Sequence, residues 1–180
     1  MSWEKISNAL SILDLTKLLI ASVITMAGGV VLFFRAFSVN RRIAKNLGRP
    51  IFIFCPQGGK RANGQNIDMK REIGVLRNAG YFNIPSEVCD DAHSIEPSEI
   101  EKAGVVIMGY HPAMTNFDEI VRLAKLHNKP LIVYTFELGV RLKDEHHQVL
   151  QDYKWYTLSS MPLRLVSDVF AIMASFNHDK

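Results

Sequence analysis

Residues 51–55 read IFIFC, residues 105–108 read VVIM and residues 131–136 read LIVYTF. All three runs are apolar at nearly every position and rich in β-branched or aromatic side chains. The first two end at the turn formers Pro56 and Gly109. A strand that is apolar on both faces is typical of a parallel sheet, in which helices cover both sides. The three runs therefore predict the central strands of a parallel sheet.

Helical patterns alternate with these runs along the rest of the chain. Residues 155–158 (WYTL) form a further strand candidate, and residues 81–88 form an edge-strand candidate broken by Pro85. Asn116 or Thr115 is placed to begin one of the helices. This order predicts an α/β domain with three flavodoxin-like layers, about five parallel strands and the strand order 2-1-3-4-5. The helices are expected after residue 66 and at residues 95–102, 116–127, 143–152 and 162–176.

The charge is unevenly distributed along the 180 residues. The chain carries a formal net charge of +3, but residues 35–49 alone hold five basic residues and no acid. Residues 1–17 are balanced, so residues 50–180 carry −2. A mildly acidic globular part is a poor match for a polyphosphate, and we expect no nucleic-acid partner.

Residues 18–34 read LLIASVITMAGGVVLFF and hold no charge. A helix of this segment, extended to residue 37, is long enough to cross the hydrocarbon core of a bilayer. The basic residues that follow favour retention on the cytoplasmic side. The expected organisation is a single-pass protein of the cell inner membrane with its C-terminal domain in the cytoplasm. Its parts are a short interfacial helix (1–16), a transmembrane helix (17–37), a basic juxtamembrane linker (38–49) and the α/β domain (50–180).

Two alternatives to the anchor remain open, a buried core helix and a cleaved signal peptide. For the basic segment 38–49, the alternative to a linker is that the membrane helix continues through it. Within the apolar segment Ala21, Thr25 and Gly29 recur every four residues and form a face of small side chains. Such a face predicts self-association in lipid, although small residues are also common in membrane helices generally.

The ligand site is expected where the carboxyl ends of the first and third strands meet, at the reversal of strand order. The loop after the strand at 51–55 reads PQGGKRANG. The loop after the strand at 105–108, which is the third strand when 81–88 is counted as the second, reads GYHPAMTN. Glycines allow close backbone approach, and the basic side chains suit a phosphate. The alternative is a turn with solvated lysine and arginine. The candidate ligand-binding residues are Gly58, Gly59, Lys60, Arg61, Asn63, Gly64, Tyr110 and His111.

Catalytic and metal-binding signals are sparse. Cys55 and Cys89 lack the spacing of a zinc site, and no metal is expected. Glu119 is the candidate catalytic carboxylate, with the alternative that it only complements the dipole at a helix start.

Four segments in the same order resemble a TIR domain: IFIFCPQGG (51–59), EVCDDAHSIEPSEI (87–100), VVIMGYHP (105–112) and NFDEIVRLA (116–124). They resemble the family's opening strand and loop, its second strand with the acidic loop, the strand that normally ends in Ser-Pro, and the helix that carries a tryptophan. Phe117 stands at the position where the family has this tryptophan. In family members that cleave NAD this helix also carries a glutamate, which implies a role for Glu119. The anchored arrangement is similar to that of bacterial antiviral effectors that sense a nucleotide signal.

We therefore expect a membrane-tethered domain that binds a nucleotide-type ligand, such as NAD or a cyclic nucleotide, in signalling or antiviral defence. We expect it to form homo-oligomers through the small-residue face of the membrane helix and through the α/β domain. We expect binding without catalysis. The alternatives are an NAD-cleaving hydrolase that uses Glu119 and a non-catalytic scaffold at the membrane.

Overall fold

A computed structural model describes residues 3–60, 64, 66–84, 96–136 and 140–178 and divides the chain into two compact units, Met1–Arg42 and Ile43–Lys180. The first unit belongs to one long helix, α1 (Trp3–Leu47), whose last five residues lie in the second unit. The part Ile20–Leu47 is long and apolar enough to cross a membrane, with a mean hydropathy of 1.9. Helix α1 runs through residue 38 without interruption, so the basic segment continues the helix.

The second unit is built on a sheet of four parallel strands. They are β1 (Ile51–Phe54), β2 (Val105–Tyr110), β3 (Leu131–Thr135) and β4 (Tyr156–Ser159), in the order β1-β2-β3-β4. Ile51 lies opposite Val105, and Leu131 lies opposite Tyr156. Every residue of the first three strands is buried, which is the physical reason for their unbroken apolar sequences. The predicted α/β class and parallel sheet are confirmed.

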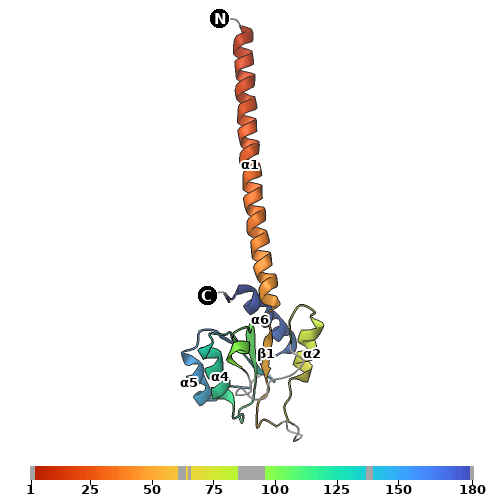
Figure 1. The fold of residues 1–180 in the computed structure, drawn as a ribbon, viewed down its shortest axis with the longest axis vertical. Coiled ribbons are helices and arrows are strands. Elements are labelled where there is room, and N and C mark those ends of the chain that lie inside the picture. The colour runs from red at the N-terminus through yellow and green to blue at the C-terminus, as the bar shows by residue number, and fades with distance from the viewer. Residues whose placement is uncertain (1–2, 61–63, 65, 85–95, 137–139, 179–180) are drawn as a thin grey trace. The chain divides into compact units, whose positions relative to one another are not determined.

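Helices cover both faces of this sheet (Figure 1). The helices α3 (Pro97–Ile100), α4 (Phe117–Leu126) and α5 (Asp144–Gln151) bury their apolar residues in one core cluster, with Phe54, Val106 and Val133. The helices α2 (Lys70–Asn78) and α6 (Pro162–Ser175) do so in a second cluster, with Ile53, Ile107 and Ile132. Neighbouring residues of one strand thus contribute to opposite cores, as the two-residue period of a strand requires.

The expected five strands are not confirmed, because the described sheet has four. The segment predicted as the second strand, 81–88, contributes a single parallel bridge between Pro50 and Asn83, in which Ile51 N donates to Asn83 O at 3.0 Å. From residue 85 onward that segment lies outside the described residues.

Candidate functional site

The loops that follow β1 and β2 meet at the carboxyl edge of the sheet. At Gly59 a side-chain Cβ would lie 3.0 Å from both Cβ and Cγ of His111, so the approach of the two loops requires a glycine. Gly58 has a φ of +79°, a conformation that glycine adopts without strain, and a Cβ there would lie 3.2 Å from Ala113 O. The structure thus places four of these loop residues against one another.

The side chain of Asn116 joins the same two loops. Gln57 N donates to Asn116 Oδ1 at 3.2 Å, and Asn116 Nδ2 donates to Cys55 O at 3.2 Å. A backbone bond from Thr115 N to Gln57 O at 3.1 Å lies beside them. Asn116 is 4% exposed and precedes α4, as predicted, but its side chain makes no capping bond to that helix. The sequence shows a capping residue there, and no sequence signal indicated the link between loops.

Lys60 and His111, the polar candidates that the structure describes in these two loops, have different surroundings. Lys60 is exposed and forms an antiparallel bridge with Asn66, at the base of the loop that holds Gly64 (φ +79°). His111 is half-buried, and its Nδ1 accepts a hydrogen bond from Ala113 N at 3.1 Å. The neutral imidazole therefore carries its proton on Nε2, which is the atom left to contact a ligand. Arg61 and Asn63 lie outside the described residues.

Tyr110 is placed apart from the other candidates. Its side chain is 1% exposed and belongs to the core cluster under α4 and α5. Its hydroxyl oxygen accepts a bond from Lys143 N at 3.0 Å and lies 3.1 Å from His146 Nδ1. Its ring packs edge-to-face against Phe117 and His146, with centroids 5.8 Å and 5.6 Å away. A buried ring with these neighbours fixes the loop after β2 and offers no exposed face for stacking.

His146 makes the stability of this cluster depend on pH. Burial lowers the pKa of His146 below its ordinary value of about 6.5, and Lys143 lowers it further, while Asp118 and Glu145 act in the opposite direction. Its ring also stacks on Phe117, with centroids 4.1 Å apart. A histidine whose pKa is lower in the folded state gives stability that is complete above about pH 6.5 and is lost as the pH falls through the folded-state pKa.

We expect the free energy of unfolding to decrease between pH 7 and pH 5, with a contribution from His146 of at most about 1.4 kcal/mol per pH unit. Urea unfolding at several pH values measures this slope. His146→Gln, which keeps a hydrogen-bond acceptor without titrating, should flatten it. His147→Gln, at the exposed neighbouring position, should not. An unchanged slope in His146→Gln would contradict the assignment.

Glu119 lies in the first turn of α4 and is half-buried. Asp118 precedes it in the same turn, where acids complement the positive end of the helix dipole. Among the described residues no group of three or more His, Cys, Asp or Glu side chains is placed to hold a metal ion.

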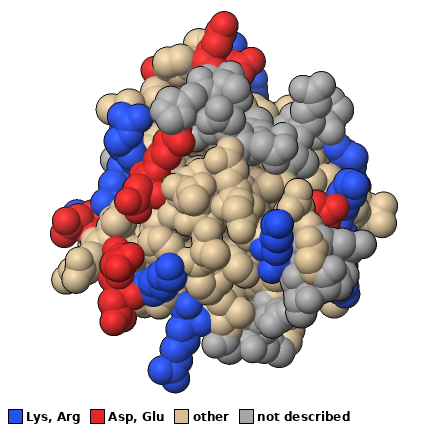
Figure 2. Space-filling model, turned by 90° about the horizontal axis from the view of Figure 1, so that it is seen from below, with Lys and Arg blue, Asp and Glu red and all other residues tan. Residues whose placement is uncertain are grey.

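The face at the carboxyl edge is seen in Figure 2, in which the centre is uncharged and charged groups of both signs lie mainly around the rim. The space next to Gly109, near the end of β2, is filled. A Cβ at that position would lie 2.9 Å from Phe136 Cζ, 3.0 Å from Met69 Sδ and 3.0 Å from Pro56 Cδ. A ligand bound here would therefore lie over the loops, above these packed side chains.

A buried polar pair lies at the same end of the sheet, on the face covered by α2. The Tyr134 hydroxyl donates to Glu72 Oε1 at 3.1 Å, and Glu72 is 5% exposed. Burial raises the pKa of Tyr134, as do the charge of Glu72 and its hydrogen bond. This pair is not among the predicted site residues, although a glutamate between the apolar positions of α2 is a sequence signal for it.

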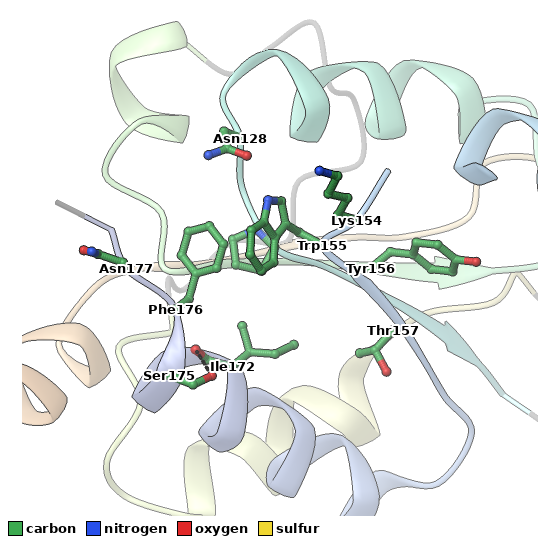
Figure 3. Close-up of a pocket in the computed structure, with 10 residues that line it drawn as sticks. Asn128, Lys154, Trp155, Tyr156, Thr157, Ile172, Ser175, Phe176 and Asn177 are labelled. Carbon is green, nitrogen blue, oxygen red and sulfur yellow. Dashed lines mark hydrogen bonds between the residues drawn. The ribbon is translucent and has the colours of Figure 1, made fainter. Parts of the chain in front are cut away.

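A second site missed by the sequence analysis is a pocket at the opposite, amino edge of the sheet, with a volume of about 550 Å³. It lies between the start of β4 and the end of α6 (Figure 3). Trp155 and Phe176 form part of its wall, and their rings meet edge-to-face at 5.1 Å. These residues are far apart in the sequence and come together only through the packing of α6 beside β4.

Comparison of the chain with protein-family models and with curated proteins found no match.

Proposed function

We propose that the chain is a membrane-anchored α/β protein whose domain binds a nucleotide-type ligand, through a phosphate, at the carboxyl edge above β1 and β2. The observation that carries the proposal is the junction of the two loops there. Asn116 holds them together, and the junction leaves Lys60 exposed on one loop and His111 half-buried on the other. A lysine ammonium and an imidazole Nε2–H both donate to phosphate oxygens, and hydrogen bonds to a charged group are the stronger kind.

The proposed anchor is supported by α1. All side chains from Ile20 to Arg42 are exposed, so no described residue covers the apolar ones. Thr25 Oγ1 donates to Ala21 O at 2.8 Å, which satisfies its hydroxyl within the helix, as lipid surroundings require. The basic residues after the apolar part favour a cytoplasmic C-terminal domain at the cell inner membrane. Self-assembly through Ala21, Thr25 and Gly29 is part of the proposal.

The flavodoxin-like order with a fifth strand next to β1 is also proposed. It is supported by the faces that the helices cover. Crossovers between parallel strands are right-handed. Because α2 packs on the face opposite α4 and α5, a right-handed crossover through α2 runs away from β2, to the far side of β1. The bridge between Pro50 and Asn83 lies on that side. This arrangement places a reversal of strand order between β1 and β2, where the two loops meet.

The resemblance to TIR domains and to membrane-anchored antiviral effectors gives the proposal a biological setting. In that setting the ligand is a nucleotide signal, and its binding changes the assembly of the protein in the membrane. A ligand shifts such an equilibrium only to the extent that it binds one state more tightly. Signalling or antiviral defence at the membrane is thus the proposed role.

The test uses the full chain in detergent, with thermal unfolding followed in the presence of NAD, cyclic AMP, cyclic GMP or inorganic phosphate. We expect at least one nucleotide to raise the Tm. Lys60→Ala and His111→Ala should each weaken its Kd about tenfold or more, the equivalent of one charged hydrogen bond. Lys102→Ala serves as the control, because Lys102 is exposed in the turn between α3 and the start of β2, at the other edge of the sheet.

Two outcomes would overturn the proposal of a binding site. One is that no probe changes the Tm. The other is that Lys60→Ala and His111→Ala bind as the control does. The same samples are assayed for NAD loss beside Glu119→Gln, and turnover that this substitution abolishes would replace the sensor by a hydrolase.

A further inference from the structure

The pocket at the amino edge has an apolar wall and a polar rim. Its apolar surface comes from Trp155, Phe176, Ile172 and Pro130, on β3, β4 and α6 or next to them. Trp155 lies in the turn before β4 and is 48% exposed, a large fraction for a tryptophan. Figure 3 shows the rings of Trp155 and Phe176 facing the centre of the pocket, with Asn128 and Lys154 on one side of them.

The charge of the pocket indicates what chemistry would fill it. Lys154 is the charged residue among the ten that line it, and it is exposed. Asn128 and Asn177 add amide groups at the rim. An apolar cavity of this size with one cation at its edge suits a molecule with an apolar body and an anionic head.

The pocket also lies at the edge of the domain where α1 ends. Asn46, one of the five residues of α1 that belong to the α/β unit, donates from Nδ2 to the backbone oxygen of Phe176 at 3.2 Å. Three residues, 48–50, then lead to β1. Leu126, at the end of α4 on the same edge, is 72% exposed. Asn46 thus ties the end of α1 to this edge, nine positions after residue 37, where the expected anchor ends.

We propose that the amino-edge pocket binds an anionic phospholipid of the bilayer in which α1 is anchored. The apolar wall formed by Trp155, Phe176 and Ile172 packs against the upper part of an acyl chain, and Lys154 contacts the phosphate. Tryptophan and lysine are the side chains that favour this depth of the membrane interface. The inference rests on the proposed membrane anchor and is independent of the ligand site at the carboxyl edge.

The chain supplies its own probe, because its two tryptophans are Trp3 and Trp155. The full chain with Trp3→Phe is reconstituted in vesicles of phosphatidylcholine, with or without phosphatidylglycerol whose acyl chains are brominated near the headgroup. Bromine quenches tryptophan emission at short range. We expect Trp155 to lose emission when the phosphatidylglycerol is brominated, and much less when only the phosphatidylcholine is. In Lys154→Gln about fivefold more phosphatidylglycerol should be needed for the same loss, as for one lysine at an anionic surface.

Lys102→Gln is the matched control, because it removes an exposed lysine that does not line the pocket. A second variant, Ile172→Gln, places an amide on the apolar wall at a half-buried position and should also reduce quenching. Equal emission in brominated and unbrominated vesicles would overturn the inference, as would equal quenching of Lys154→Gln and the control.

Carbonate extraction of the same vesicles tests separately whether α1 anchors the protein in the membrane. Protein that stays in the membrane with unquenched Trp155 means that the pocket inference fails and the anchor holds. Protein that carbonate removes means that the anchor fails, and with it the bilayer lipid proposed for the pocket. Nucleotide binding at the carboxyl edge is followed by the Tm and should not change in Lys154→Gln.

Discussion

Asn116→Ala is expected to lower the free energy of unfolding by about 2–3 kcal/mol and to abolish ligand binding at the carboxyl edge. The substitution removes the bonds to Gln57 N and Cys55 O, each of which contributes about 1 kcal/mol. It also leaves a small cavity at a buried position, which adds to the loss. Without these bonds the loop after β1 is no longer held against the loop after β2.

The variant Asn116→Asp tests the two hydrogen bonds of the Asn116 side chain individually. An ionised aspartate still accepts from Gln57 N, but it places an oxygen against Cys55 O, where the amide donated. We therefore expect the aspartate variant to lose stability as well, and its deficit to shrink at acidic pH, where the carboxyl gains a proton to donate. Asn78→Ala, at the exposed end of α2, is the control.

Urea unfolding and nucleotide-dependent Tm shifts measure the two effects on the same samples. If Asn116→Ala is as stable as the control, the side chain does not join the loops. If it is destabilised yet binds nucleotide with unchanged Kd, the ligand site lies elsewhere.

Gly109→Val is expected to lower the free energy of unfolding by about 3 kcal/mol. The new side chain enters a space that Phe136, Met69 and Pro56 already fill to within 3.0 Å of the Cβ position. Overpacking a core typically costs 1–3 kcal/mol, and the contact with Pro56 puts this case at the upper end, because a proline ring has little freedom to move.

Gly74→Ala is the control for that experiment, because Gly74 lies inside α2 and a Cβ there would meet no heavy atom within 4 Å beyond its chain neighbours and the backbone of its own helix. It should instead raise the free energy of unfolding by about 0.5–1 kcal/mol, since glycine is unfavourable within a helix. Chemical denaturation of both variants gives the comparison. A Gly109→Val variant as stable as the parent chain would show that this end of β2 is not packed as described.

The central strands could be predicted from sequence because their environment leaves a simple signature. The runs at 51–55, 105–108 and 131–136 correspond to β1, β2 and β3 within two residues at each end. Burial on both faces demands an apolar residue at every position, so neither periodicity nor distant contacts were needed. The strand at 155–158 was also found, shifted by one residue.

The strand predicted at residues 81–88 shows the limit of that reasoning. Residues 81–88 read YFNIPSEV, in which Asn83, Pro85, Ser86 and Glu87 leave no continuous apolar run, and Pro85 also lacks a backbone donor. Pairing at an edge depends on backbone partners that the sequence does not display. The described part of this segment contributes the bridge at Asn83 alone.

The site was only partly predictable for a related reason. The approach of Gly59 to His111 follows from loops at neighbouring strand ends, which the alternating order of elements implies. The loop sequence predicts a ligand contact for Tyr110, but its position two residues beyond Met108 places both side chains on one buried face. The link through Asn116 and the pairing of Trp155 with Phe176 join segments whose relation is set only by packing.

The distance along the chain between paired strands has a consequence for folding during synthesis. β1 pairs with β2, whose first residue lies 54 positions later, whereas β2 and β3 pair across 25 positions. A ribosome adding about 5–20 residues per second exposes β1 for several seconds before its partner emerges. Helix α1 leaves the ribosome earlier still. If α1 inserts into a bilayer as proposed, it emerges before the sheet can close, and the apolar residues of β1 remain without their neighbouring strand during that interval.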